Sequence, residues 1–155
     1  MPDDNYSRRA FLKKFAYLST GALALSATSM ACYGPPPENQ FQYPMVRGMS
    51  FLDSQLNPVS LRDNQNVPVQ TKFLIEFTED MNEAAPTTVY LTDSGNVAAP
   101  YDKVWSSVRT LAVTPSADLK LDTGYTLSLG NDAQDARGYT IVLTENATAT
   151  FKTIA

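Results

Sequence analysis

The chain has 155 residues, 43% of them hydrophobic and 18% charged, with one Cys and no His. This length suits one ordinary domain. The Cys and His counts exclude intrachain disulfides, His-based catalytic triads and zinc sites built from His or from several Cys. Residues 32–155 carry eight basic and fourteen acidic side chains. Because phosphate binding needs clustered Lys and Arg, this acidic body argues against nucleic acid as a partner.

Residues 1–31 have the layout of an export signal, in which a charged stretch precedes an apolar run rich in Ala, Leu, Ser and Thr. The apolar run is short and dilute for a stable membrane span, which needs ~20 strongly apolar residues. We expect a helix over residues 9–30. The charged stretch resembles the twin-arginine export motif through Ser7, Arg8, Arg9, Phe11, Leu12 and Lys13. A general secretory signal that contains two arginines, or an uncleaved anchor, are the alternatives.

The only cysteine of the chain directly follows this apolar run. Ser29-Met30-Ala31-Cys32 resembles a bacterial lipoprotein cleavage box, although Leu is usual where Ser29 stands. The resemblance implies that Cys32 becomes the mature N-terminus and carries diacylglycerol on its sulfur. Each buried CH₂ of an acyl chain contributes about 0.8 kcal/mol, so several chains would hold a small domain firmly on a membrane. The alternative is ordinary signal cleavage near Ala31, which leaves a free thiol.

Residues 32–44 contain the lipid-attachment Cys and a proline-rich spacer. The three consecutive prolines Pro35–Pro37 favour an extended polyproline conformation, at about 3.1 Å per residue. The segment from Tyr33 to Pro44 would then span roughly 35 Å. We interpret it as a stalk, and a proline-rich recognition ligand is the alternative.

From residue 45 onward the hydrophobic pattern has a period of two. Phe73, Ile75 and Phe77 share one face, with Lys72 and Glu76 on the other, which is typical of a half-buried strand. The same pattern predicts strands at 110–114, 125–129 and 147–152, and weaker ones at 45–52, 88–91, 99–105 and 139–143. Turn residues separate them at 93–96, 121–124 and 135–138. The body shows no amphipathic helix of ten or more residues, since Pro86 ends the helical stretch 80–85 after one turn.

Seven or eight short strands without a long helix predict an all-β fold, an Ig-like antiparallel β-sandwich over residues 45–155. We expect Phe77 and Met81 to pack into the edge of the sandwich. The Tyr125 ring should be buried with its hydroxyl on a backbone group. Gly124 and Gly138 should adopt positive φ angles in tight turns.

Residues 55–155 resemble the Ig-like domain of bacterial S-layer and cell-surface proteins, the SbsA type. The segment Phe-Thr-Glu-Asp-Met-Asn at 77–82 matches a motif of that family, and Tyr139 stands where the family has Asn after the turn Gly138. The other matching segments follow in the family's order at 66–69, 110–115, 119–127, 135–138 and 151–153. The resemblance implies a spacer, adhesion or accessory module outside the cytoplasm. It carries no family-wide catalytic residues.

Two groups of side chains are candidates for ligand binding. Tyr101 and Trp105 share one face of a predicted strand, where they could stack on sugars or other flat ligands; the alternative is packing in the core or across strands. Four acidic loop residues carry the oxygen ligands that Ca²⁺ prefers. However, there is no Asp-x-Asp-x-Asp loop, and aspartates are also standard in turns, so we predict no metal site. These four residues are Asp118, Asp122, Asp132 and Asp135.

Catalytic motifs are lacking in the sequence. It contains no Gly-x-Ser-x-Gly elbow, no Ser-x-x-Lys motif and no His. Glu79 and Asp80 adjoin, so on a strand they would point to opposite faces. We therefore expect neither an enzyme nor a cofactor.

These observations favour a non-enzymatic, lipid-anchored module of the bacterial envelope, periplasmic or at the cell surface. Its edge strands and loops would serve protein interaction, adhesion or scaffolding, with the membrane and an envelope protein as partners. One alternative is a carbohydrate- or small-ligand-binding module that uses Tyr101 and Trp105. Another is an accessory subunit of an exported redox enzyme, because the twin-arginine route exports folded proteins, often with a cofactor-bearing partner.

Overall fold

The computed structural model of the chain describes residues 42–154. The helix expected at 9–30, the export motif from Ser7 to Lys13, Cys32 and most of the spacer lie outside these residues. The described part belongs to one compact unit that begins at Gln42.

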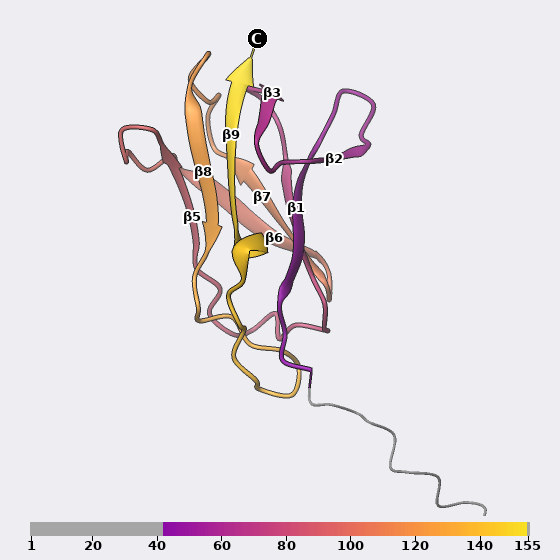
Figure 1. Ribbon diagram of the computed structural model, residues 1–155. Helices are drawn as coiled ribbons and strands as arrows, with labels where there is room; N and C mark the ends of the chain where they lie inside the picture. The colour runs from indigo at the N-terminus through magenta and orange to yellow at the C-terminus, as the bar shows by residue number, and fades with distance from the viewer. Residues whose placement is uncertain (1–41, 155) are drawn as a thin grey trace, which may run out of the picture. The chain divides into compact units, whose positions relative to one another are not determined.

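Two β-sheets lie face to face in this unit (Figure 1). One has five strands in the order β2-β1-β4-β7-β6, and the other has four in the order β3-β9-β8-β5. A single turn of 3₁₀ helix, Glu145–Ala147, is the helical element among residues 42–154. The prediction of an all-β, Ig-like sandwich is thus confirmed. The strands are β1 (Val46–Leu52), β2 (Pro58–Ser60), β3 (Asn64–Pro68), β4 (Phe73–Phe77), β5 (Val89–Asp93), β6 (Tyr101–Ser107), β7 (Thr110–Pro115), β8 (Gly124–Leu129) and β9 (Thr148–Ile154).

The core lies between the two sheets and is built from alternate residues of each strand. Phe73 of β4 meets Phe151 of β9 across the sandwich, with ring centroids 5.1 Å apart. The Tyr125 ring stacks on Phe151 at 5.7 Å, and its hydroxyl accepts the Lys120 N–H at 2.9 Å. Phe77 is 1% exposed and Met81 is also buried. The core positions expected for Phe77, Met81 and Tyr125 are therefore confirmed.

Three details of strand placement differ from the sequence-based predictions. The described residues hold nine strands, because β2 and β3 are short polar segments that alternation does not reveal. One pair, β3 with β9, is parallel in an otherwise antiparallel fold. The predicted strand at 139–143 is wrong: this segment makes only isolated bridges at Thr140 and Val142, and the Val142 side chain is exposed.

The two glycines expected at positive φ behave differently. Gly138 has φ 87°, as predicted, and Gly138 N donates to the Asp135 carbonyl at 2.9 Å. Gly124 does not have positive φ and begins β8; the left-handed residue of that turn is Asp122, with φ 50°. The prediction for Gly124 is thus wrong, because Asp tolerates the left-handed region when its short side chain sits in a turn.

The chain enters the sandwich at the end opposite to the C-terminus of β9 (Figure 1). The Arg137 guanidinium donates to the Gln42 carbonyl at 2.9 Å, and the rings of Tyr43 and Tyr139 meet edge to face at 5.9 Å. The start of the domain is therefore held against the turn that contains Gly138. We call the opposite end, where β1 and β9 finish, the distal end.

Candidate interaction surfaces

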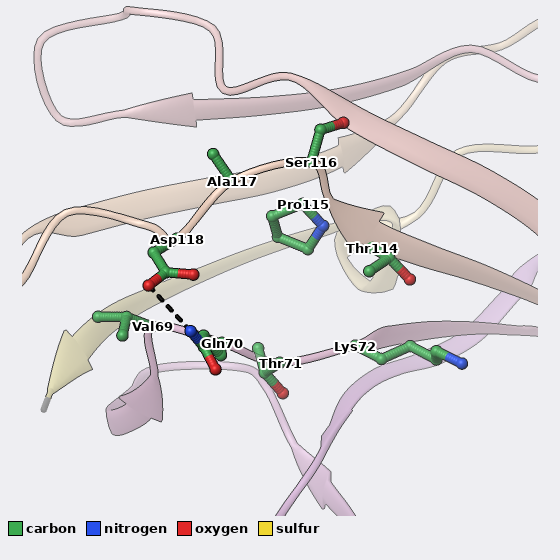
Figure 2. A pocket seen from close by; sticks show the side chains of 9 residues that line it. All are labelled: Val69, Gln70, Thr71, Lys72, Thr114, Pro115, Ser116, Ala117 and Asp118. Atoms are coloured by element: carbon green, nitrogen blue, oxygen red, sulfur yellow. Dashed lines mark hydrogen bonds between the residues drawn. The ribbon is translucent and has the colours of Figure 1, made fainter.

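An open crevice of about 330 Å³ lies at the distal end, where β4 begins and β7 finishes (Figure 2). One wall is the segment 69–72 and the other is the segment 114–118. Gln70 Nε2 donates to Asp118 Oδ2 at 2.9 Å and bridges the two walls, as the dashed line in Figure 2 shows. Leu119 N donates to the Val69 carbonyl at 3.0 Å and joins the walls again.

A proline explains why the two strands separate here. In an antiparallel pair of strands, hydrogen-bonded and non-hydrogen-bonded residue pairs alternate. Phe77 N donates to the Arg109 carbonyl, so the odd-numbered residues of β4 form the hydrogen-bonded pairs with β7. Phe73 belongs to the last of these pairs, and continuing the register would place Thr71 opposite Pro115. Because proline has no N–H to donate, the ladder ends at this point and leaves the crevice.

Several polar side chains of the crevice are hydrogen-bonded within the domain. Its Asp118 carboxylate accepts from Gln70, and the Thr71 hydroxyl donates to the Leu52 carbonyl at 3.0 Å. The Lys72 side chain extends away from the other lining side chains in Figure 2. The polar groups of Gln70, Thr71 and Asp118 thus hold the walls of the crevice in place.

The outer edge of β6 is a second candidate surface, and it is built from backbone. Within residues 42–154, β6 pairs with β7 on one side only, because it is the last strand of its sheet. Ser116 N donates to the Pro100 carbonyl at 2.9 Å, which places the hydrogen-bonded pairs at even-numbered residues of β6. The N–H and C=O groups of Tyr101, Lys103 and Trp105 consequently point to the open side.

In contrast to β6, the edge of the four-stranded sheet at β5 is covered. Ala99 N donates to the Leu91 carbonyl at 2.8 Å, so the segment that leaves β5 folds back along it. The Tyr101 hydroxyl donates to the Val89 carbonyl at 2.5 Å and occupies the next free acceptor. A strand from another molecule would have to displace these contacts before it could pair with β5.

The two remaining edges are poor templates for pairing. β2 has three residues and begins with Pro58. β3 has five residues, ends with Pro68 and shows a register irregularity after Asn64. Short strands and prolines are the usual protections of sheet edges. Among the described strands, β6 alone therefore combines seven residues with an uncovered edge.

The aromatic pair predicted on β6 faces the interior. Tyr101 and Trp105 do share one face, and both are half-buried against the core. The Trp105 ring lies 5.5 Å from the Phe77 ring, and the Tyr101 hydroxyl is bonded to Val89. The two rings are thus part of the packing, which was the alternative interpretation, and they do not form an exposed strip for a flat ligand.

The four acidic residues considered for calcium lie in separate places with separate partners. Asp118 accepts from Gln70, and Asp122 pairs with the Lys152 ammonium at 2.6 Å. The carboxylate of Asp132 accepts the hydroxyl and the N–H of Thr88, and Asp135 forms a turn with Arg137. Within residues 42–154, no three acidic side chains converge in a way that could hold a metal ion.

Two buried carboxylates organise turns. The Lys120 ammonium 2.7 Å away, and then the N–H groups of Val97 and Gly95, lower the pKa of Asp93. Burial by itself would raise the pKa of Asp135, but the Tyr139 N–H, the Arg137 guanidinium and the Arg137 N–H outweigh it and lower the pKa. Both carboxylates thus stay ionised as structural acceptors.

The adjacent carboxylates of Glu79 and Asp80 each contact an arginine. Glu79 lies 3.6 Å from the Arg137 guanidinium, and Asp80 lies 2.5 Å from the Arg109 guanidinium. The two carboxylates therefore lie against different arginines, and Arg137 also pairs with Asp135. No helix of the described segment 42–154 is both long and apolar enough to cross a membrane.

Comparisons with known proteins agree with this architecture. A model of the bacterial Ig-like domain family matches residues 54–153. Among solved structures, the crystal structure of CopC from Methylosinus trichosporium OB3b is similar, with a TM-score of 0.50 and 10% sequence identity over 72% of this chain and 94% of that chain. At this identity the likeness concerns the fold alone. No curated protein matches the chain.

Proposed function

Because the chain belongs to the bacterial Ig-like domain family, we propose that it is a non-enzymatic module of the bacterial envelope that binds another protein through the open edge of β6. The observation that carries this proposal is the row of unpaired backbone groups at Tyr101, Lys103 and Trp105. An extended segment of a partner can add to such an edge, since backbone hydrogen bonds supply affinity and alternate side chains supply specificity.

The proposed location is outside the cytoplasm, with the chain anchored by lipid at Cys32. The twin-arginine pattern around Arg8 and Arg9, the single cysteine after an apolar run and the proline-rich spacer support this part of the proposal. The resemblance to SbsA-type surface domains supports it as well. The chain enters the sandwich at the end opposite to the distal crevice.

A non-enzymatic role is supported by the way the ionisable groups are used. Asp93, Asp132 and Asp135 hold turns, and Asp80 and Glu79 pair with arginines. Among the residues that line the distal crevice, Asp118 is the one acid, and its carboxylate accepts a hydrogen bond from Gln70.

The test is photo-cross-linking of the full chain in living bacterial cells. A photoreactive amino acid at Val104, on the outward face of β6, should give a discrete cross-linked product with a protein, identified by mass spectrometry. The matched control places the same amino acid at Tyr90, an exposed residue of β5. Absence of a product from Val104, or equal products from both positions, would contradict a specific contact at β6.

A further inference from the structure

We infer that the occupant of the β6 edge is a second copy of this chain, paired antiparallel about a two-fold axis at Val104. The inference rests on the proposed function of that edge and names its partner. Antiparallel pairing of identical strands about a two-fold axis is self-complementary and closes at two copies, so it needs no second kind of surface.

The backbone geometry restricts the possible registers. To form hydrogen bonds between the copies, residues whose backbone N–H and C=O groups point to the open side must lie opposite each other. On β6 these residues are Tyr101, Lys103 and Trp105. The two-fold axis must therefore pass through a residue rather than between two. Val104 is the midpoint of the strand Tyr101–Ser107, so an axis there overlaps the whole of β6 with its copy.

Charge selects the same register. An axis at Lys103 would place that lysine opposite itself, and an axis at Asp102 would do the same for an aspartate. Like charges directly opposite each other destabilise a strand pair. With the axis at Val104, Asp102 faces Ser106 of the copy and Lys103 faces Trp105 of the copy. An axis at Trp105 avoids like charges too, but it leaves the first two residues of β6 unpaired.

The outward face of the sheet supports an axis at Val104. Leu74 of β4 lies opposite Ala112 of β7, which lies opposite Val104 of β6. This apolar row runs from half-buried Leu74 through Ala112, which is 3% exposed, to Val104, which is 65% exposed at the open edge. Pairing about Val104 sets two valines side by side in a non-hydrogen-bonded position, where side chains are closest. It thereby joins the two rows into one and buries their exposed ends.

The edge has less protection than the other edges, since its one register irregularity lies near the end of the strand, between Trp105 and Ser107. Lysine is a common guard of edge strands, but the Lys103 ammonium is turned inward and donates to the Thr87 carbonyl. β6 contains no proline between Tyr101 and Ser107. The strand is therefore long, uncovered and compatible with a copy of itself.

Cysteine cross-linking of the full chain tests the register directly. Opposing Cα atoms at a non-hydrogen-bonded position lie about 4.5 Å apart, within the range for a disulfide. Val104→Cys should form a disulfide-linked dimer under mild oxidation, and the unaltered chain, whose one cysteine is Cys32, measures the background. Asp102→Cys and Ser106→Cys should cross-link when mixed but not singly, because like positions would lie about 13 Å apart along the strands.

The mixed experiment distinguishes the alternative registers. Cross-linking of Asp102→Cys with Val104→Cys, or of Lys103→Cys with itself, would place the axis at Lys103 and overturn the proposal. No dimer above background from Val104→Cys, in a chain that circular dichroism shows to be folded, would overturn it as well.

Association without cross-linking is measured by sedimentation of the full chain in detergent micelles. Val104→Lys puts two ammonium groups together at the axis and should weaken the dimer by about tenfold. The matched control is Val97→Lys, since Val97 is 57% exposed but lies in the loop after β5, and it should leave the association unchanged. Equal weakening by both variants, a monomer at every concentration or species larger than a dimer would overturn the proposal. A cellular photo-product at Val104 that contains only a different protein would overturn it too, while the proposed function would stand.

Discussion

At the scale of single residues, buried carboxylates decide how the loops are held. The Asp135 side chain is 1% exposed and accepts the N–H groups of Arg137 and Tyr139 at 2.9 and 2.8 Å. The Arg137 guanidinium lies 2.7 Å from the same carboxylate and also donates to the Gln42 carbonyl. One aspartate thus links the turn before Tyr139 to the point where the chain enters the domain.

These carboxylates predict how stability depends on pH. The pKa values of Asp93, Asp132 and Asp135 are all lowered from 3.8 by their contacts in the fold. A group with a lower pKa in the folded state stabilises the fold fully above its unfolded pKa and loses that contribution as the pH falls through its folded pKa. The free energy of unfolding should therefore change little from pH 7 to about pH 5 and fall below about pH 4.

Denaturant unfolding at pH 7, 5 and 3 measures this dependence. Asp135→Asn should be less stable at pH 7, because a charged acceptor is lost, and should show a shallower decline in acid. Stability that rises on acidification, or an Asp135→Asn variant with the original acid slope, would contradict the assignment.

The two turn glycines form a matched pair for a second prediction. Gly138→Ala should cost about 1–2 kcal/mol of stability, because φ 87° is unfavourable for a residue with a Cβ. Gly124→Ala should change stability by less than about 0.5 kcal/mol, since its new Cβ would meet Ser94 Cβ at an ordinary 3.7 Å. Chemical denaturation of both variants measures the difference. The reverse order would show that backbone conformation does not govern these turns.

Phe77 is a test of the core. Its side chain is 1% exposed and contacts the Trp105 ring, so Phe77→Ala should cost about 3–5 kcal/mol through the cavity that it leaves. Urea unfolding followed by the fluorescence of Trp105, the one tryptophan, measures the loss. Val97→Ala, in an exposed loop, should stay within about 0.5 kcal/mol and serves as the control. A loss below about 1 kcal/mol in Phe77→Ala would mean that the sandwich has other dominant contacts.

At the scale of elements, alternation predicted the strands that bury one complete face. β4, β7, β8 and β9 each bury two or more side chains at alternate positions, so a period of two is visible in their sequences. β3 buries Val67 alone, and β2 buries no side chain fully. These two strands exist because they pair with neighbours, which a single-segment pattern does not contain. The segment 139–143 shows the converse, since Ile141 is buried but the apolar residues Val142 and Leu143 beside it are exposed.

The aromatic pair on β6 shows why the candidate site was less predictable than the fold. Alternation placed Tyr101 and Trp105 on one face, but it does not say which face meets the other sheet. The free edge of β6 depends on the order of strands in the sheet, which follows from long-range pairing. Side-chain patterns carry little information about backbone groups that are left unpaired, so the sequence indicated edge strands in general and not this one.

Hydrogen exchange should resolve the two kinds of amide on β6. In dilute solution, where copies do not associate, the amides of Asp102 and Val104 bond to β7 and should exchange slowly. The amides of Lys103 and Trp105 face the open side and should exchange much faster. NMR or mass spectrometry with fragment resolution measures the contrast. Equal protection along the strand would mean that the edge is covered within one molecule.

At the scale of the whole molecule, the start of the domain and the distal crevice lie at opposite ends of the sandwich. Gln42 and Tyr43 are held at one end by Arg137 and Tyr139, and the crevice lies at the other end. The β6 edge lies at the border of the five-stranded sheet.

Whether Cys32 is acylated tests the proposed location of the protein. If Cys32 carries diacylglycerol, the intact mass of the membrane-extracted protein should correspond to a chain that starts at Cys32 plus its acyl chains. Cys32→Ser should move the protein from the membrane fraction to the soluble exported fraction or leave it unprocessed, because the apolar contribution of about 0.8 kcal/mol per buried CH₂ is lost. The spacer and the sandwich are unchanged in this variant, so its circular dichroism should equal that of the unaltered domain.

A second variant tests the export route independently of the lipid anchor. Arg8→Lys together with Arg9→Lys keeps the charge of the N-terminal stretch and should retain the protein in the cytoplasm if the twin-arginine motif is used. Unchanged export of this variant, with Cys32 still acylated, would assign the chain to the general secretory route and leave the anchor in place. A full-length mass of all 155 residues in the membrane fraction would instead indicate an uncleaved N-terminal segment, and the anchor would then not be Cys32.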